Sequence, residues 1–204
     1  MTKIKICGLK REEDIQYVNQ VRPDFIGFIF AAKSHRYVDP AQAARLSAML
    51  DPDITPAGVF VNAPAEDVSA LLKSGVIKIA QLHGSEDEDY IARLRALTEA
   101  PIIKAFSVET AEDVARAVTS SADYLLLDHG SGGTGEAFDW NLLTGINRPY
   151  FLAGGLDPGN VREALRLAAP FAVDVSSGVE TDKIKDPEKI RAFVRAVREM
   201  EERE

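Results

Sequence analysis

The chain has 204 residues, 46% of them hydrophobic, and a formal net charge of -8 at pH 7. A duplex-binding protein needs a basic surface, so nucleic acid is not an expected partner. No stretch approaches the roughly 18 unbroken apolar residues of a membrane span, and the N-terminus lacks the apolar run of a secretory signal. The single cysteine excludes an intramolecular disulfide. We therefore expect a cytoplasmic protein with no membrane partner.

Short apolar runs alternate with amphipathic stretches along the whole chain. The runs that predict strands are Lys3–Cys7, Asp24–Phe30, Ala57–Val61, Val76–Gln81, Ile102–Phe106, Tyr124–Leu127, Tyr150–Ala153 and Phe171–Val175. The stretches that predict helices are Glu12–Gln20, Pro40–Leu50, Ala65–Lys73, Asp87–Leu97, Ala111–Thr119, Pro158–Leu167 and Pro187–Arg198. After the sixth strand comes a glycine-rich segment and then only a short helix near Asp139–Leu143.

Three of these helices carry a start signal, an aspartate N-cap followed by proline at the first helical position. The signals are Asp39-Pro40, Asp157-Pro158 and Asp186-Pro187. Repeated strand–helix–strand units require parallel strands with right-handed crossovers. We expect an α/β fold in which residues 1–204 form a single (β/α)8 TIM barrel, because closure of eight strands removes both sheet edges. A doubly wound open sheet stays open as an alternative, since periodicity does not prove closure.

The first strand has two unlike faces. Ile4 and Ile6 share one face, while Lys5 and Cys7 share the other. Strands of a parallel sheet normally bury both faces, so a lysine–cysteine face needs a reason. We expect the isoleucines to face the helix layer and Lys5 and Cys7 to point into the barrel and its mouth.

Three later strands also end in polar groups. Asp128 follows the apolar sixth strand, Asp174 lies among valines in the eighth, and Gln81 and His83 close the fourth. Each has an ordinary alternative: a lone cysteine is usually a small buried residue, Asp128 could start a turn, and His83 could be a loop histidine. A buried Asp174, however, must find partners or stay protonated. Because catalytic groups of such barrels lie at the C-terminal ends of strands, this convergence predicts an active site.

Two glycine-bearing turns follow the seventh and eighth strands. The first contains Gly154 and Gly155, and the second contains Ser176, Ser177 and Gly178. Loops at these positions are the usual phosphate site of this barrel, because backbone N–H groups can approach the anion where no Cβ intrudes. Ordinary tight turns are the alternative. We expect a phosphate-bearing small molecule to bind here.

We expect neither a metal nor an organic cofactor. The segment 130–135 matches G-x-G-x-x-G, but it does not open a long helix in an early βαβ unit, so it fits a glycine-rich lid better than a dinucleotide site. No G-x-S-x-G nucleophile elbow occurs. The histidines lack the spacing of a zinc motif and stand at positions 35, 83 and 129.

A set of seven short motifs follows in order along the whole chain. Each motif is weak alone, but seven in sequence are specific. They are Lys5-Ile6-Cys7-Gly8, Phe60-Val61-Asn62, Gln81-Leu82-His83-Gly84, Leu127-Asp128 with Gly132-Gly133-Thr134-Gly135, Phe138-Asp139-Trp140, Leu152-Ala153-Gly154-Gly155-Leu156 and Asp174-Val175-Ser176-Ser177-Gly178-Val179-Glu180.

Together these motifs resemble the phosphoribosylanthranilate isomerases of tryptophan biosynthesis, and the resemblance implies a role for each candidate residue. Cys7 would be the general base, Asp128 the general acid, and Arg36 would lie near the anthranilate carboxylate of the substrate. Asp174 would lie near the sugar hydroxyls, and we expect His83 to bind substrate as well. The family pattern has proline where this chain has a histidine before Arg36, a departure that bears on loop rigidity and not on the chemistry.

The implied reaction is the Amadori rearrangement of N-(5-phosphoribosyl)anthranilate, which needs acid–base catalysis and no redox cofactor. We expect Lys5 to lower the pKa of Cys7, and burial together with Asp174 to raise the pKa of Asp128. The alternatives are another phosphosugar isomerase or epimerase, and a non-catalytic phosphoribosyl-binding barrel. The sequence does not distinguish a monomer from a homodimer.

Overall fold

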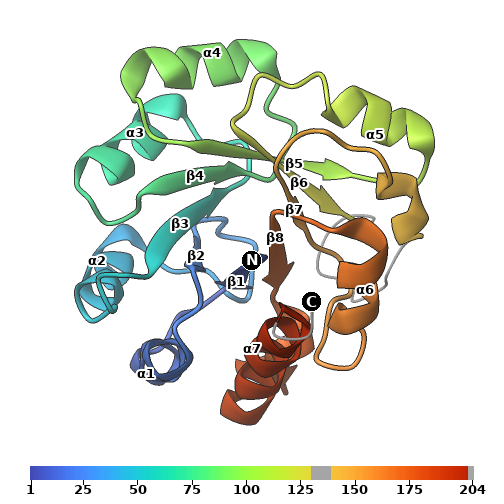
Figure 1. Ribbon diagram of the computed structural model, residues 1–204. Coiled ribbons are helices and arrows are strands. Elements are labelled where there is room, and N and C mark those ends of the chain that lie inside the picture. Colours follow the sequence, from blue (N-terminus) through green and yellow to red (C-terminus); the bar gives the residue numbers. More distant parts are fainter. Residues whose placement is uncertain (130–138, 202–204) are drawn as a thin grey trace.

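Eight parallel strands close into a barrel in the computed structural model, which describes residues 1–129 and 139–201 (Figure 1). The strands are β1 (Lys3–Cys7), β2 (Phe25–Ile29), β3 (Thr55–Phe60), β4 (Ile79–Leu82), β5 (Ile102–Ser107), β6 (Tyr124–Asp128), β7 (Tyr150–Leu152) and β8 (Ala172–Val175). The last strand pairs with the first, with Lys3 opposite Ala172 and Ile6 opposite Val175. The expected (β/α)8 barrel is confirmed, and the open-sheet alternative was wrong.

Helices form an outer layer around these strands (Figure 1). They are α1 (Glu12–Val21), α2 (Pro40–Ala48), α3 (Ala65–Lys73), α4 (Glu88–Leu97), α5 (Ala111–Ala117), α6 (Val161–Ala168) and α7 (Pro187–Glu201), with single 3₁₀ turns η1 (Trp140–Leu143) and η2 (Ser177–Val179). A two-stranded hairpin, β9 (Glu180–Thr181) and β10 (Ile184–Lys185), lies between β8 and α7. Among the described residues, none of these helices is long and apolar enough to cross a membrane.

Two of the three predicted helix starts are confirmed. Asp39 accepts a hydrogen bond from the backbone of Gln42, and Asp186 accepts from the backbone of the second and third residues after it. The prediction for α6 was wrong, because the helix begins at Val161. Asp157 instead accepts from the N–H groups of the two residues that precede the helix, at 2.6 and 3.1 Å, and closes a turn before it.

The fourth strand also begins later than expected, at Ile79. The chain leaves α3 through Gly75, whose φ is +77°, and the backbone N–H of Lys78 donates to Pro56 O at 2.8 Å before the ladder starts. Ile77 consequently packs in the core between strands and helices, whereas Ile79 packs inside the barrel.

Aromatic side chains fill the end of the barrel at which the strands have their N-termini. The Phe151 ring centroid lies 5.4 Å from that of Phe25 and 5.7 Å from those of Tyr124 and Phe171. Edge-to-face contacts of this kind favour dense packing. This end is filled with side chains, and a cavity lies at the opposite end, where the strands have their C-termini.

Candidate active site

A cavity of about 220 Å³ opens at the C-terminal mouth of the barrel. The structure brings nine of the ten predicted site residues to this cavity, and its lining comprises Cys7, Ile29, Ala31, Ser34, Arg36, Val59, Val61, Gln81, His83, Asp128, Ala153, Gly154, Gly155, Leu156, Asp174, Val175, Ser176 and Ser177. The tenth, Gly178, lies behind it. A Cβ there would stand 1.9 Å from Leu156 O, so glycine lets the loop after β8 pack against the loop after β7.

The alternation predicted for β1 is confirmed. Ile4 and Ile6 pack in the core beneath the helices, while Lys5 is fully buried inside the barrel and Cys7 reaches the cavity. Lys5 Nζ donates to Asp174 Oδ2 at 2.9 Å. This pair explains how a carboxylate is accommodated among valines, since each charge neutralises the other in a dry environment. Asp174 Oδ1 is buried, and no described residue hydrogen-bonds to it.

Cys7 is a free, buried thiol. Gly27 on β2 makes room for it, because a Cβ at that position would stand 2.6 Å from the sulfur. Burial raises the pKa of the Cys7 thiol, and the positive charges of Lys5 and Lys185 oppose that rise without overcoming it. The expected effect of Lys5 is present, since its charge acts to lower the Cys7 pKa, but desolvation outweighs it and the negative charge of Asp174 adds to the rise.

Asp128 ends β6 and points into the same cavity. Burial raises its pKa to about 6, with the negative charge of Asp174 adding to the rise, although the backbone N–H of His129 donates to Oδ1 at 2.7 Å and opposes it. This agrees with the sequence expectation in direction and cause. The carboxyl is therefore a much weaker acid than an exposed aspartate.

His83 lies beside Asp128, with its Nε2 3.7 Å from Oδ2 of the carboxyl group. Burial lowers the pKa of His83, so the ring is neutral at pH 7. The Gln81 side-chain nitrogen lies 3.0 Å from His83 Nδ1. A neutral ring carries one proton, and when the amide nitrogen donates to Nδ1 that proton is on Nε2, toward Asp128.

The two late loops approach the catalytic end closely. Gly154 has φ of +85°, and a Cβ there would stand 2.8 Å from Asp128 Oδ1. Gly155 also has a positive φ, of +64°. On the other loop, Ser176 Oγ donates to the backbone oxygen of Cys7 at 3.1 Å, which ties the loop after β8 to the end of β1.

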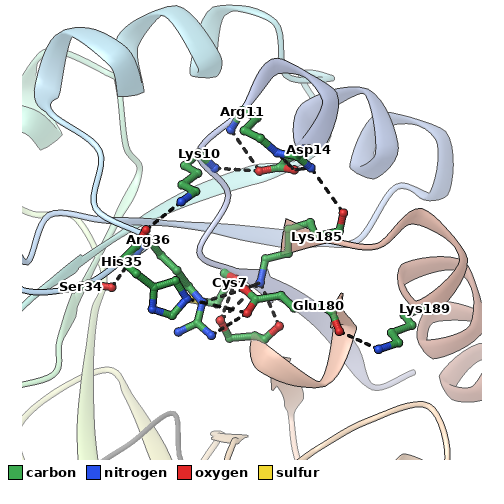
Figure 2. A network of polar contacts seen from close by, with 11 residues as sticks. Cys7, Lys10, Arg11, Asp14, Ser34, His35, Arg36, Glu180, Lys185 and Lys189 are labelled. Atoms are coloured by element: carbon green, nitrogen blue, oxygen red, sulfur yellow. Dashed lines mark hydrogen bonds and ion pairs between the residues drawn. The ribbon is translucent and has the colours of Figure 1, made fainter. Parts of the chain in front are cut away.

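Arg36 lines the cavity from the loop after β2, and its guanidinium forms a forked ion pair with Glu180. A second cation, Lys185, donates to the same carboxylate (Figure 2). Sequence reasoning missed both partners. Glu180 stands in a quoted motif, but only the β9–β10 hairpin brings the lysine beside it, and no periodicity indicates that pairing.

Other predictions on this site fall partly outside the described residues. The expected glycine-rich lid at 130–135 lies wholly within the undescribed segment. Within residues 1–129 and 139–201, no group of three or more histidine, cysteine, aspartate or glutamate side chains is arranged to hold a metal ion.

Comparisons with known proteins identify relatives along the full chain. The family model described as N-(5'phosphoribosyl)anthranilate (PRA) isomerase matches residues 4–196. The curated N-(5'-phosphoribosyl)anthranilate isomerase of Endomicrobium trichonymphae is 44% identical over 98% of this chain and 100% of its own length.

Solved structures agree in fold. The crystal structure of phosphoribosyl anthranilate isomerase from Thermotoga maritima has a TM-score of 0.91 and 36% identity, over 98% of this chain and 100% of that one. A phosphoribosyl anthranilate isomerase solved in complex with reduced 1-(o-carboxyphenylamino)-1-deoxyribulose 5-phosphate has a TM-score of 0.88 and 35% identity, over the same shares of both chains.

Proposed function

The chain belongs to the N-(5'-phosphoribosyl)anthranilate isomerase family, and from this premise we propose that Cys7 and Asp128 are the general base and general acid of its reaction. The protein is an isomerase of tryptophan biosynthesis. Family membership removes the two alternatives that the sequence left open, an epimerase and a non-catalytic binding barrel. The observation that carries the proposal is that both side chains line one cavity at the mouth of the barrel.

The reaction moves hydrogen within a phosphopentose joined to anthranilate. Asp128 gives a proton to the ring oxygen, so that the C1–oxygen bond breaks and a Schiff base forms between C1 and the anthranilate nitrogen. Cys7 then removes the proton from C2, and the electron pair moves toward the nitrogen to give an enolamine. Tautomerisation of the enolamine gives the ketone at C2, so the overall change is an isomerisation with no oxidant or reductant.

The environment of Asp128 supports its role as the acid. At a pKa of about 6, roughly a tenth of the carboxyl groups are protonated at pH 7, against about 0.1% for an ordinary aspartate. The loop after β7 covers one side of it, because Gly154 brings backbone within contact distance. The neutral His83 ring beside it can donate to the carboxylate that remains after proton transfer.

Cys7 and Asp128 must act in the less populated of two protonation states of the pair. The reaction needs a protonated Asp128 and a deprotonated Cys7, whereas a pKa of about 6 and a raised thiol pKa favour the opposite at pH 7. Both states carry the same number of protons, so the active fraction is small but constant between the two pKa values. A thiolate of high pKa is also a stronger base toward a C–H bond, which compensates for its scarcity.

We assign the anthranilate carboxylate of the substrate to Arg36 and the phosphate to the two late loops. Arg36 faces the cavity with a guanidinium that can bind a second carboxylate in a forked geometry. Gly154, Gly155 and the segment 176–178 supply backbone N–H groups near glycine positions where an anion can approach. Asp174 and His83 line the same cavity, and we assign the sugar hydroxyls to them.

The small-molecule substrate is the partner that this site supports. We also propose a cytoplasmic location, because Cys7 must remain a free thiol to act as a base and the cytosol keeps thiols reduced.

The proposal is tested by following the loss of anthranilate fluorescence after adding N-(5-phosphoribosyl)anthranilate. The wild-type protein should consume the substrate, and the Cys7→Ser and Asp128→Asn variants should each do so roughly 10²–10⁴-fold more slowly. Near-wild-type decay with either variant would remove that residue from its assigned role.

A further inference from the structure

Glu180 joins two cations that come from different parts of the chain (Figure 2). Its Oε1 accepts from Arg36 Nε at 2.7 Å and from Lys185 Nζ at 2.7 Å, and its Oε2 accepts from Arg36 Nη2 at 2.8 Å. The Glu180 side chain is only 6% exposed. A buried carboxylate bound by two cations is held in one place, because any movement would break charge-assisted hydrogen bonds.

The carboxylate is ionised throughout the neutral range. Burial alone would raise the pKa of Glu180, but hydrogen bonds and charge from Arg36 and Lys185 outweigh it and lower the pKa to about 2. The forked pair uses Arg36 Nε and one Nη2 hydrogen, and it therefore leaves the Nη1 edge of the planar guanidinium for another acceptor. Arg36 also lines the cavity, and the edge that Glu180 occupies is not available to a ligand there.

Lys185 fixes this arrangement to the frame of the barrel. It is 3% exposed, and its Nζ also donates to the backbone oxygen of Ser176 at 2.9 Å. Ser176 Oγ in turn donates to the backbone oxygen of Cys7. Glu180 and Lys185 are direct partners across the β9–β10 hairpin, whose turn residues both have positive φ. A continuous set of contacts thus connects Arg36 to the end of β1.

The charges of this cluster also suit an incoming anion. Arg36 and Lys185 both pair with the single carboxylate of Glu180; burial lowers the pKa of Lys185, and the charge and hydrogen bond of Glu180 oppose that fall. The neighbouring His35 adds no positive charge at pH 7, because burial and the charge of Arg36 lower its pKa. Without Lys185, Glu180 would cancel the charge of Arg36, and a carboxylate ligand would meet a neutral site.

We propose that Glu180 is a positioning residue for substrate recognition, which holds Arg36 by one edge so that its other edge receives the anthranilate carboxylate. This inference rests on the proposed function of Arg36. Lys185 is the anchor that keeps Glu180 in place and shares its carboxylate with Arg36.

The test measures the Kd of two ligands by calorimetry. One is the reduced product analogue, 1-(o-carboxyphenylamino)-1-deoxyribulose 5-phosphate in its reduced form, which carries the aryl carboxylate; the other is ribulose 5-phosphate, which lacks it. Glu180→Gln should raise the Kd of the analogue about tenfold, which corresponds to one mispositioned charge-assisted hydrogen bond. The Kd of ribulose 5-phosphate should stay within about threefold of the wild-type value. Glu188→Gln removes the carboxylate of an exposed ion pair on α7 and should change neither Kd.

A double variant shows whether Glu180 acts through Arg36. Arg36→Ala should weaken the analogue by more than Glu180→Gln does, and Arg36→Ala with Glu180→Gln should match Arg36→Ala alone. Circular dichroism and a melting curve establish that each variant is folded. Should Glu180→Gln fold poorly, Glu180→Asp keeps the charge but is too short for the same fork, and it should also weaken the analogue selectively.

Three results would overturn the inference. Equal weakening of both ligands by Glu180→Gln would indicate a general structural role. Additive losses in the double variant would show that Glu180 acts independently of Arg36. An unchanged analogue Kd in Arg36→Ala would remove the proposed function of Arg36 itself, and that outcome differs from a failure of Glu180 alone, in which Arg36→Ala still weakens binding.

Discussion

The substitution Asp128→Asn tests the assignment of the general acid most sharply. Asparagine keeps the size of the side chain and an oxygen that can accept from the backbone of His129, a bond of 2.7 Å in the structure. It cannot give up a proton to the ring oxygen of the substrate. The change therefore removes the acid and leaves the shape of the cavity close to that of the wild type.

The size of the effect follows from the environment of the carboxyl group. A pKa raised from 3.8 to about 6 corresponds to about 3 kcal/mol in favour of the protonated form, and it increases the protonated fraction at pH 7 roughly a hundredfold. Losing the positioned acid altogether should reduce kcat by about 10²–10⁴-fold. Because wild-type kcat/KM requires one proton shared between Asp128 and Cys7, it should be constant at neutral pH and fall below about pH 6.

The assay is the initial rate of fluorescence loss between pH 5 and pH 8, measured for the wild type, Asp128→Asn and Asp89→Asn. The last variant carries the same substitution at an exposed position on α4 and should behave as the wild type. In Asp128→Asn the residual activity should follow the thiolate fraction of Cys7, rising about tenfold per pH unit across this range with no break near pH 6. A kcat within threefold of the wild type, or a break near pH 6 followed by a plateau that survives the substitution, would refute the assignment.

Three further predictions concern the other residues of the cavity. Cys7→Ser should lower kcat by about 10²–10⁴-fold while the Kd of the reduced product analogue stays within about threefold, and a matching loss of binding would indicate a structural role. Arg36→Ala should raise KM by about 10–100-fold, as expected for a lost charge-assisted pair, and an unchanged KM would contradict its contact with the substrate carboxylate. Glu180 has a pKa of about 2 when folded, below its unfolded value, so its stabilisation of about 3 kcal/mol is present above about pH 4.5 and is lost as the pH falls toward 2. Urea unfolding of wild type and Glu180→Gln should therefore give free energies that converge as the pH falls from 4.5 to 2, and a gap independent of pH would contradict this.

The alternation of residues along the strands was enough to predict the strand-borne polar residues of the cavity, whereas Arg36 followed from the family resemblance and the phosphate loops from the fold class. In β1 it separated Ile4 and Ile6 from Lys5 and Cys7, and the structure has that division. The same argument identified Asp174 as a buried carboxylate in need of a partner, which is Lys5. Period-2 patterns work here because the strands of a closed barrel have one inner and one outer face.

The Arg36–Glu180–Lys185 cluster could not be predicted in the same way. Glu180 and Lys185 belong to the β9–β10 hairpin, whose strands have two residues each and are too short to show a periodic pattern. Arg36 comes from the loop after β2, 144 positions before Glu180. The net direction of the Cys7 pKa could not be predicted for a related reason, because sequence spacing shows that a lysine is near but not that burial of the thiol outweighs its charge. The net direction of a pKa shift depends on the balance between burial and nearby charges, and that balance can be judged only from a structure.

The most direct measurement is a crystal structure of this protein with the reduced product analogue bound. Acid–base catalysis by this pair requires the Cys7 sulfur within about 3.5 Å of C2, and a carboxyl oxygen of Asp128 within about 3.2 Å of the oxygen on C4. We expect both contacts in one complex, with the aryl carboxylate on Arg36. A ligand seated with either side chain on the far side of the pentose, out of reach of those atoms, would contradict the account.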